Sequence, residues 1–454
     1  MKNFKDATWK ENVSKVIQQI QELEIKFIRL QFTDINGILK NLAVNSKNIE
    51  TIFENGQSFD GSSITGYRPI EESDMVLYPD PSTYAVLPWR PKEKSSARLI
   101  CDIYTPQNKR FDGDPRYVLE RTVEKAAKAG YTFICAPELE FFIVKESETG
   151  GLPTPIDLAG YFDFHPGDLT DDLRREIADT AEAFGIEIEI SHHEVALGQN
   201  EIDFKYDEAL KTADRTITMK MCGKVVGARN GYITTYMPKP FAGINGSGMH
   251  THMSLWNKNV SQNLFYEDDE KSGYLSDLAR NFIGGQLAHG RKMCAILDSW
   301  PNSFKRLVPG YEAPVYLAWA HKNRSPLIRV TNFGGRKNAA RCEIRCPDGA
   351  GNPYLQFAVL LATGLDGIKN KIDPGDPVEL NVYHMTYEER KERNIVSLPE
   401  SLKEALDELE TSDLMRDTLG ETAFTNFLIE KRREWDLYRT QVTEWEVNRY
   451  IKRL

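Results

Sequence analysis

The fold is organised around the apolar run Ala136-Pro137-Glu138-Leu139-Glu140-Phe141-Phe142-Ile143, which contains two glutamates. Its composition is typical of a β-strand, and side chains on a strand alternate between the two faces of a sheet. Glu138 and Glu140 therefore share one face, while Leu139, Phe141 and Ile143 share the other. Adjacent carboxylates repel each other and resist burial. The run predicts a strand with one core-facing side and an opposite side on which a cation neutralises the two glutamates.

Three more segments repeat this pattern, with polar ligand-type residues on alternate positions of a predicted strand. They are residues 191–204, with Glu194, Glu201 and Asp203; residues 245–254, with His250 and His252; and residues 341–346, with Arg341, Glu343 and Arg345. Oxygen-rich sites with one imidazole suit Mg²⁺ or Mn²⁺ better than a structural zinc ion. Five glutamates and His250 exceed what one octahedral ion that keeps waters would take, so two or more metal ions are expected.

The alternative for each segment is a solvated strand face whose charges are held in salt bridges. Most acidic residues are exposed, so for any single pair of glutamates this interpretation has even odds or better. The four segments taken together favour the metal interpretation, because the same alternation of ligand types recurs in all of them.

A set of arginines could bind anions beside these carboxylates: Arg306, Arg324, Arg329, Arg341 and Arg345. A guanidinium group binds carboxylate or phosphate through a planar pair of donors. Carboxylate-bound metals beside several arginines meet the requirement of phosphoryl transfer from a nucleotide, where charge is neutralised from several sides. For any one arginine, a pair with a surface acid is the commoner case. The chain has no G-x-x-x-x-G-K-S/T loop and no kinase motif set, so ATP would be held mainly through metals and arginines.

Size and composition bound the other possibilities. The chain has 454 residues, of which 41% are hydrophobic and 27% charged, and its net charge is −10. This length predicts two or more domains, and the charge argues against general binding to nucleic acid or acidic membranes. No apolar run reaches the ~18 residues that span a bilayer, the start lacks the apolar core of a signal peptide, and the cysteines form no Cys-x-x-Cys pair. A reducing, cytoplasmic location is expected.

Apolar spacing and capping residues predict a mixture of strands and helices. We expect a helix over 9–24 and a hairpin over 27–44 that turns through Asn36-Gly37, a strong two-residue turn signal. Residues 105–113 are the best candidate domain boundary, after which Asp114 caps a helix that Gly130 ends. Further helices are expected over 171–184, 208–221, 276–288 and 354–370, followed by an almost wholly helical tail after residue 398.

Separated motifs give the chain a resemblance to a known enzyme family. They are residues 59–64 (Phe59-Asp60-Gly61-Ser62-Ser63-Ile64), 137–142, 193–201, 245–254, and 302–314 with 341–354. In this order they resemble type I glutamine synthetase of bacteria and archaea, over nearly the whole chain. The chain lacks the extra stretch between Glu140 and Glu194 found in the adenylylated branch, so it is most similar to the I-α branch. Arg68 lies one place earlier than the arginine that follows this loop in feedback-inhibited members.

The resemblance implies an α+β fold in two domains. A small N-terminal β-grasp domain over 1–112 would carry the Asp60 loop. A catalytic domain over 113–454 would contain a curved antiparallel sheet, forming a half-barrel funnel backed by helices. The family assembles as a homo-dodecamer of two hexameric rings, in which the Asp60 loop is offered to the funnel of a neighbouring subunit. Some members are also partners of regulatory proteins.

The implied reaction ligates ammonia to the γ-carboxylate of L-glutamate at the expense of ATP, giving L-glutamine, ADP and phosphate through γ-glutamyl phosphate. Two or three Mg²⁺ or Mn²⁺ ions are implied, with Glu140, Glu194 and Glu201 holding one, and Glu138, His250 and Glu343 a second. The implied nucleotide contacts are Glu189, His252, Ser254, Arg324, Arg329 and Arg341. The implied substrate contacts are Asn245, Gly246, Arg306, Glu312, Arg324 and Arg345. The implied catalytic residues are Asp60, which deprotonates ammonium, Glu312, whose flap excludes water, and Arg329 and Arg345, which stabilise the transferring phosphoryl group.

Two other functions fit part of the same residues. A γ-glutamyl ligase for amines or polyamines would share the metal and ATP motifs but alter the ammonium pocket, whereas the intact Asp60-Gly61-Ser62-Ser63 loop and Glu312 favour ammonia. A catalytically inactive homologue that serves as a scaffold would have lost metal-binding or phosphoryl-binding residues, and none of the matched positions is lost. Glutamine formation from ammonia is therefore the prediction.

Overall fold

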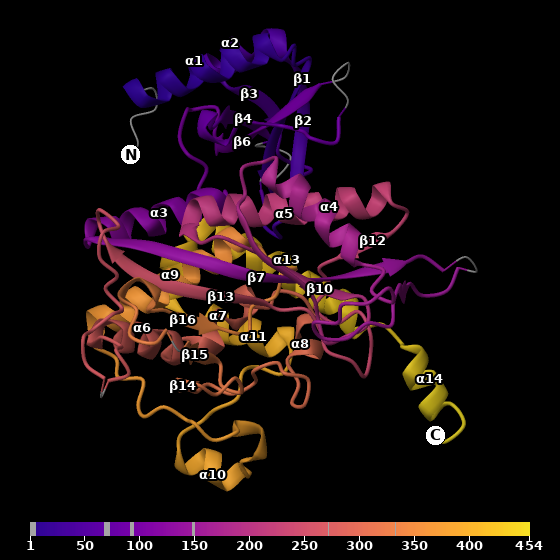
Figure 1. Cartoon of the computed structure of the whole chain (residues 1–454), viewed down its shortest axis with the longest axis vertical. Helices are drawn as coiled ribbons and strands as arrows, with labels where there is room; N and C mark the ends of the chain where they lie inside the picture. The colour runs from indigo at the N-terminus through magenta and orange to yellow at the C-terminus, as the bar shows by residue number, and fades with distance from the viewer. Residues whose placement is uncertain (1–5, 68–72, 91–94, 148–149, 271, 332) are drawn as a thin grey trace.

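The computed structural model describes residues 6–67, 73–90, 95–147, 150–270, 272–331 and 333–454, so Arg68 lies outside the described residues. A small N-terminal part sits on a larger C-terminal part (Figure 1). The two parts have separate apolar cores, one drawn from residues between Val16 and Phe111 and one drawn mainly from residues between Val118 and Leu428. Among the described residues, the helices are too short or too polar to cross a membrane.

The N-terminal part is a mixed sheet flanked by helices α1 (Ala7–Glu22) and α2 (Ile49–Asn55). Its strands are β1 (Phe27–Thr33), β2 (Leu39–Asn45), β3 (Gln57–Asp60), β4 (Asp74–Pro79), β5 (Ala85–Val86) and β6 (Ser96–Tyr104). Their order is β2-β1-β6-β4-β3, with β5 also paired to β6. Strands β1 and β6 run parallel in the centre, between antiparallel neighbours. This arrangement confirms the expected β-grasp.

The turn between β1 and β2 differs from the prediction. Pairing begins at Thr33 and Leu39, so residues 34–38 form the loop and the expected two-residue turn is wrong. The side chain of Asp34 shapes this loop by accepting hydrogen bonds from the backbone nitrogens of Asn36 (3.0 Å) and Ile38 (2.9 Å). Gly37 has a φ of 78°, and a Cβ atom there would lie 2.7 Å from Cα of Asn352. Glycine at position 37 therefore allows both the positive φ of the turn and the close approach of the C-terminal part.

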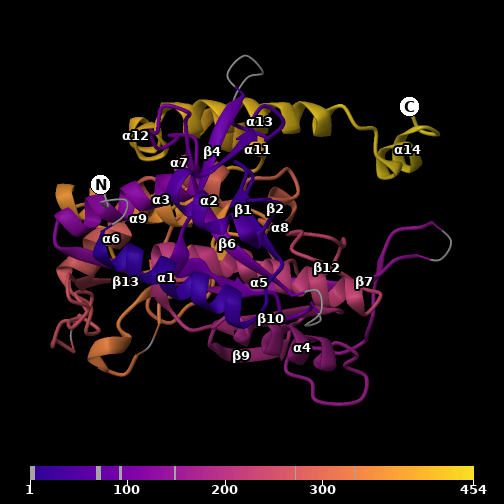
Figure 2. The same ribbon diagram turned by 90° about the horizontal axis from the view of Figure 1, so that it is seen from above.

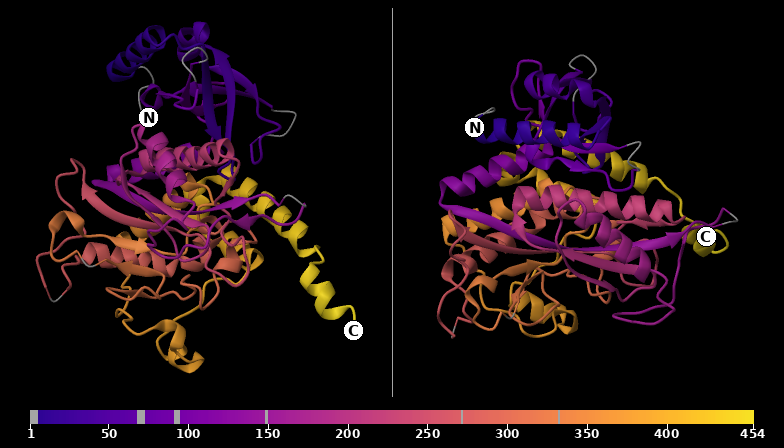
Figure 3. Two further views of the ribbon diagram at one scale, coloured as in Figure 1. Left: turned by 45° about the vertical axis from the view of Figure 1, so that its right-hand side comes forward. Right: turned by 45° about the horizontal axis from the view of Figure 1, so that its top comes forward.

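The C-terminal part is built on one long sheet in the order β14-β15-β16-β13-β7-β10-β9, with β8, β11 and β12 also paired to β7. Its strands are β7 (Tyr131–Lys145), β8 (Thr154–Pro155), β9 (Ile188–His193), β10 (Gln199–Phe204), β11 (Asp207–Glu208), β12 (Ile233–Thr235), β13 (Met249–Asn257), β14 (Trp319–Ala320), β15 (Ile328–Val330) and β16 (Cys342–Ile344). The sheet curls into the expected half-barrel (Figure 3). One edge corrects the expectation of an antiparallel sheet, because the short strands β14 and β15 pair in parallel.

Helices back this sheet, and α3, α4 and α5 lie between it and the N-terminal part (Figure 1). The helices are α3 (Pro115–Lys128), α4 (Asp171–Glu182), α5 (Ala209–Arg229), α6 (Asp277–Ala288), α7 (Gly290–Leu297), α8 (Ser303–Arg306), α9 (Pro353–Asn370), α10 (Tyr387–Glu392), α11 (Leu402–Glu410), α12 (Asp413–Leu419), α13 (Glu421–Arg439) and α14 (Glu444–Tyr450). The predicted helices and the helical tail are present. Helix α5 runs past the expected Met221 because Cys222, Gly223 and Val226 continue its buried face.

A buried ion-pair cluster joins the two parts. Arg116 of α3 contacts Asp80 (3.0 Å) and Asp102 (2.7 Å) of the N-terminal part, and Asp214 (3.0 Å) of α5. Such pairs add little net stability, but losing one partner leaves an uncompensated buried charge, which makes the docking geometry specific. Nδ2 of Asn352 adds hydrogen bonds to the backbone carbonyls of residues 34 and 35. The N-terminal part is therefore held against α3, α5 and the start of α9.

The last helix, α14, projects away from the body of the molecule, as the view from above shows (Figure 2). Its apolar side chains Trp445, Val447 and Tyr450 are exposed, as are Ile451 and Leu454 beyond it. A helix whose apolar side chains are exposed in one chain is a candidate contact surface.

Candidate active site

A cavity of about 230 Å³ lies on the sheet face that carries Glu138 and Glu140. Its lining combines acidic and basic residues predicted from the sequence: Glu138, Glu140, Glu194, Glu201 and Glu312 with Arg306, Arg324, Arg329 and Arg345. Asn245, Gly246 and His250 also line it. The fold thus brings together residues that are up to about two hundred positions apart in the sequence.

Strand pairing explains how these residues meet. Central strand β7 aligns Glu138 with His250 of β13, and Glu140 with Glu201 of β10. Strand β13 pairs in turn with β16, which carries Glu343. Residues directly opposite each other on neighbouring strands point to the same face. Because each strand already alternates ligand types with apolar residues, the register gathers all the ligand types on one face.

Glu138, His250 and Glu343 form one potential metal site, with a ligand atom from each within 4.8 Å of the others. Nδ1 of His250 lies 3.0 Å from Oε2 of Glu138 and 3.7 Å from Oε1 of Glu343. Burial opposes ionisation of Glu138, but hydrogen bonds from His250 and His252 hold the pKa of Glu138 well below its usual range. Glu138 is therefore a carboxylate that is ready to bind a cation.

Another cluster, beside Glu140, consists of His192, Glu194 and Glu201. Nε2 of His192 lies 3.2 Å from Oε1 of Glu201. Burial raises the pKa of Glu194 to about 8, and the carboxylates of Glu140 and Glu201 add to this shift. Burial also raises the pKa of Glu201. This cluster holds more negative charge than its protein partners neutralise.

The donor chemistry of both clusters fits hard divalent cations, which prefer carboxylate oxygen and accept imidazole nitrogen. Neighbouring Asp203 also has too little positive charge around its carboxyl group. Among the described residues its buried Oδ1 has no hydrogen-bond partner, and burial together with Glu201 and Glu138 raises the pKa of Asp203 to about 10. A bound cation would supply the missing charge. The structure gathers all six predicted metal ligands, and their role as ligands stays a prediction.

Metal binding to the metal-free protein is expected to strengthen as the pH rises toward 8. Glu194 must lose its proton before its carboxylate can bind a cation, and its pKa is about 8. Below that pH, binding releases a proton, so affinity should fall by up to about tenfold per pH unit. Calorimetric titration with Mn²⁺ between about pH 6 and 9 measures this effect. Glu194→Gln should bind more weakly and with a smaller pH dependence; the same pH dependence in both proteins would contradict the assignment.

Arg329 and Arg345 approach the cluster of Glu138, His250 and Glu343. Nη1 of Arg329 lies 3.0 Å from Oε2 of Glu343, and Nη1 of Arg345 contacts Oε1 of the same carboxylate. Burial opposes ionisation of Glu343, but Arg345 holds the pKa of Glu343 below its usual value. Among the described residues, Nε of Arg329 and Nε of Arg345 are buried without an acceptor. A phosphate group in the cavity would provide acceptors for such donors.

The guanidinium of Arg306 donates to the backbone carbonyls of Cys346 (2.6 Å) and Arg345 (3.0 Å). Gly248 allows this packing, since a Cβ atom there would lie 2.4 Å from Nη2 of Arg306. Arg306 therefore also stabilises the backbone just after β16, where Arg345 lies. Its predicted contact with glutamate is compatible with its place in the cavity lining.

Glu312 and Asn245 meet at the cavity, where Nδ2 of Asn245 donates to Oε2 of Glu312 at 3.2 Å. Glu312 is exposed and has a φ of 58°, a left-handed backbone that is strained for a residue with a side chain. A strained, exposed loop residue is suited to a flap that changes conformation. Gly246 next to Asn245 is required for a different reason, since a Cβ atom there would lie 2.2 Å from the carbonyl oxygen of Pro238.

A second cavity of about 500 Å³ shares Glu138 with the first. Its lining includes four of the predicted nucleotide contacts: Glu189, His252, Ser254 and Arg341. Arg324 and Arg329, which are also predicted to contact the nucleotide, line the first cavity instead. The volume is within the range of small-molecule sites. Glu138 therefore lies where the predicted places of nucleotide and glutamate meet.

Asp60 is absent from the described lining of both cavities. It ends β3 in the N-terminal part, where its exposed carboxylate accepts hydrogen bonds from the backbone nitrogen (2.8 Å) and the hydroxyl (2.7 Å) of Ser62. These bonds hold the pKa of Asp60 below its usual value, so it stays charged. Within one chain the fold does not bring Asp60 to the other site residues.

Some residues of the site carry no role in the sequence-based prediction: Tyr161, His192 and Gln199. Nε2 of Gln199 donates to Oε2 of Glu140 (2.8 Å) and to the carbonyl of Gly246 (3.1 Å), which links the acidic strand to the substrate loop. The alternation with Glu201 singles out Asp203 without giving it a role, and His192 could have been found from its place beside the acidic bend. Tyr161 lines the cavity from the long connection between β8 and α4, where no periodic pattern marks it.

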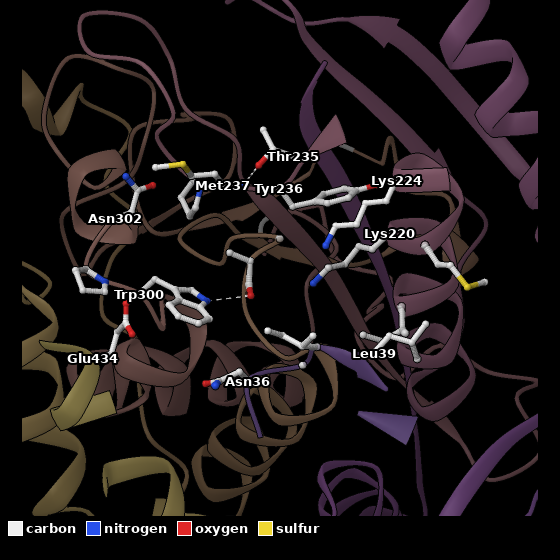
Figure 4. A pocket seen from close by; sticks show the side chains of 18 of the residues that line it. Asn36, Leu39, Lys220, Lys224, Thr235, Tyr236, Met237, Trp300, Asn302 and Glu434 are labelled. Carbon is white, nitrogen blue, oxygen red and sulfur yellow. Dashed lines mark hydrogen bonds between the residues drawn. The ribbon is translucent and has the colours of Figure 1, made fainter. Parts of the chain in front are cut away.

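A more apolar cavity of about 710 Å³ lies between the β1–β2 loop, α5 and α13 (Figure 4). Leu39, Tyr236 and Trp300 line it together with Lys220 and Lys224. Its lining contains none of the predicted metal, nucleotide or substrate residues. The chemistry that the sequence predicts therefore belongs to the two cavities that share Glu138.

Residues 112–450 match the family model described as "Glutamine synthetase, catalytic domain", and residues 24–106 match "Glutamine synthetase, beta-Grasp domain". The chain belongs to the glutamine synthetase family. It is 48% identical over 455 residues to the glutamine synthetase of Methanosarcina mazei, with 100% of both chains covered. It is 51% identical over 433 residues to the glutamine synthetase of Thermotoga maritima, with 95% of this chain and 98% of the relative covered.

Among solved structures, the chain of a "GmaS/ADP complex" matches with a TM-score of 0.87 and 32% identity, covering 96% of this chain and 99% of that chain. This likeness agrees with the glutamine synthetase fold seen here, a β-grasp part on a half-barrel part. As a member of the glutamine synthetase family, the chain is a ligase that depends on ATP and a divalent metal ion.

Proposed function

We propose that the chain makes L-glutamine from L-glutamate, ammonia and ATP through γ-glutamyl phosphate, and so serves nitrogen assimilation. One observation carries this proposal: a single cavity joins a carboxylate cluster to several arginines, and it shares Glu138 with a second cavity of suitable size for a nucleotide. A reaction that moves a phosphoryl group from ATP to a carboxylate needs this combination of charges.

In the first step the γ-carboxylate of glutamate attacks the γ-phosphorus of ATP, and the bond from that phosphorus to the bridging oxygen of ADP breaks. Arg329 and Arg345 stabilise the charge on the moving phosphoryl group. Asp60 takes a proton from ammonium, ammonia attacks the acyl carbon, and phosphate leaves. Glu312 on its strained loop keeps water from the acyl phosphate. Bound divalent metal ions neutralise phosphate charge.

The proposed metals are two or three Mg²⁺ or Mn²⁺ ions. Glu140, Glu194 and Glu201 would hold the first, and Glu138, His250 and Glu343 would hold the second, which would neutralise phosphate charge on the nucleotide. Removing metals with a chelator and measuring glutamine formation tests this proposal. Activity should return with Mg²⁺ or Mn²⁺; activity that survives complete metal removal would refute it.

The other proposed contacts follow the two cavities. For the nucleotide they are Glu189, His252, Ser254, Arg324, Arg329 and Arg341. For glutamate and its phosphorylated form they are Asn245, Gly246, Arg306, Glu312, Arg324 and Arg345. The proposed domains are residues 1–112 and residues 113–454. The proposed location is the cytoplasm, which suits six cysteines that are all buried and free.

The proposed assembly is a homo-dodecamer of two hexameric rings. Exposed Asp60, charged but separated from the site of its own chain, supports an active site completed by a neighbouring subunit. The exposed apolar side chains of α14 support a further contact between copies. Light scattering on the purified protein measures the mass of the assembly.

An amine ligase is the second candidate function, because such an enzyme would share the metal and ATP motifs of this chain. The 48–51% identity to glutamine synthetases and the Asp60 loop favour ammonia. ADP release with glutamate and ATP is expected to be faster with ammonium than with ethylamine or putrescine, because a charged carboxylate beside the nucleophile suits a small cation. Faster release with either amine would overturn this choice.

A further inference from the structure

The loop that carries Glu194 is tied to a buried pair, His193 and Asp157, whose side chains are both 0% exposed. Residues 194–198 join β9 to β10. Nε2 of His193 lies 3.2 Å from Oδ1 and 3.3 Å from Oδ2 of Asp157. Nδ1 of His193 lies 2.6 Å from the carbonyl oxygen of Glu194. The ring therefore links Asp157 to the backbone of Glu194.

The same carboxylate also holds the far end of the loop. Oδ1 of Asp157 accepts a hydrogen bond from the backbone nitrogen of Gly198 at 2.9 Å. A carboxylate and a carbonyl can only accept hydrogen bonds, so His193 donates from both ring nitrogens. Asp157 thus fixes the start of the loop through His193 and its end directly.

Apolar packing contributes less than these hydrogen bonds to holding the loop 194–198 in place. Val195 and Leu197 are 42% and 37% exposed, and only Ala196 between them is buried. A short loop with few apolar contacts loses order unless hydrogen bonds hold it. Hydrogen bonds therefore hold Glu194. Its carboxylate accepts from the backbone nitrogen of Val195 at 3.0 Å, and the bonds made by His193 and Asp157 fix the backbone at the two ends of the loop.

Asp157, Asp168 and His193 lie close enough together to resemble a metal site of their own. Asp168, however, is already paired with buried Arg174, with 2.6 Å between Nη2 and Oδ2. Asp157 already accepts from His193 and Gly198. A cation there would have to compete with a buried guanidinium, so this cluster is suited to holding the loop and not to binding metal.

We propose that Asp157 and His193 are positioning residues that aim the carboxylate of Glu194 at the metal ion it shares with Glu140 and Glu201. This inference rests on the proposed assignment of those three glutamates to the first metal. Residues that orient a metal ligand commonly change metal affinity 10–100-fold when they are replaced. The effect falls on one metal ion, because the ligands of the second belong to β7, β13 and β16.

The test is a titration of the metal-free full-length protein with Mn²⁺, followed by the electron paramagnetic resonance signal of free Mn²⁺. Asp157→Ala is expected to weaken one class of Mn²⁺ site about 10–100-fold and to leave the other within about twofold. Asp157→Asn is expected to restore most of the loss, because its amide oxygen still accepts from Gly198 and its amide nitrogen can donate to a neutral His193. Equal losses in Asp157→Ala and Asp157→Asn would overturn the proposal.

The matched control is Asp102→Asn, which removes another buried carboxylate from an ion pair, with Arg116, away from both clusters. It should leave both Mn²⁺ affinities unchanged. If Asp157→Ala does not fold, His193→Gln takes its place and should weaken the same single class. Equal weakening of both classes, or of neither, overturns the positioning role.

Glu194→Ala separates this inference from the proposed function. It should remove one Mn²⁺ site completely. If Glu194→Ala leaves every Mn²⁺ site intact, the metal assignment itself is wrong. If it removes a site that Asp157→Ala and His193→Gln leave unchanged, the assignment stands and the positioning role fails.

Discussion

Glu343→Ala is expected to lower the rate of glutamine formation by at least about 10³-fold. The fully buried carboxylate is shared by His250, Arg329 and Arg345, and it is a proposed ligand of the second metal. Its removal would leave guanidinium groups uncompensated and would take away a negative charge that would help to hold the proposed second metal. Direct measurement of glutamine from glutamate, ammonium and ATP tests this expectation.

Glu343→Gln separates charge from shape, because it keeps the side-chain volume and should still lose most of the activity. Glu208→Gln is the matched control, since Glu208 is an exposed glutamate on the same sheet and outside both cavities. It should have wild-type activity. Circular dichroism, together with Mn²⁺ binding at the site of Glu140, Glu194 and Glu201, establishes that the inactive variants are folded. An unchanged rate in folded Glu343→Ala would contradict the metal assignment.

Asp60→Ala is expected to lower the rate of glutamine formation by about 10²–10⁴-fold, because ammonium is not a nucleophile until a base removes its proton. The loss should be partly reversed when Asp60→Ala subunits are co-assembled with Glu343→Ala subunits. Asp60 and Glu343 lie in different parts of the chain and do not meet within one copy. If neighbouring subunits complete each site, about a quarter of the sites in an equal mixture would contain both wild-type residues.

The control for this experiment is co-assembly of differently tagged Asp60→Ala subunits with each other, which should restore no activity. Purification through both tags ensures that only mixed assemblies are assayed. Inactivity of mixed Asp60→Ala and Glu343→Ala assemblies would contradict a site shared between subunits. Wild-type activity in Asp60→Ala alone would remove Asp60 from the mechanism.

Local patterns in the sequence were sufficient to predict much of the fold. The alternation around Glu138 and Glu140 predicts which side chains enter the core, and Leu139 and Phe141 are each 1% exposed. The predicted cap also forms, with Asp114 accepting from the backbone nitrogen of Arg116. These features depend on residues within a few positions of each other, where steric and hydrogen-bond rules act directly.

Some features that depend on contacts between residues far apart in the sequence were predicted wrongly or not at all. The turn signal at Asn36-Gly37 gave a two-residue turn, but Asp34 and the contact of Gly37 with Asn352 impose a longer loop. The roles of Gln199 and of Tyr161 could not be recognised, because each depends on which strand or loop lies opposite. Distant partners are selected by packing of the whole core, and a local pattern does not contain that information.

Residue types and alternation along the chain predict which residues are ligand types, which face the strand residues among them occupy, and that cations neutralise their negative charge. Only the tertiary structure decided which of them meet: Glu138 with His250 and Glu343, Glu194 with Glu201 and His192, and Asp60 with none of these in its own chain. The physical reason is that alternation along a strand follows from backbone geometry, whereas the register between strands follows from the packing of side chains far apart in the chain.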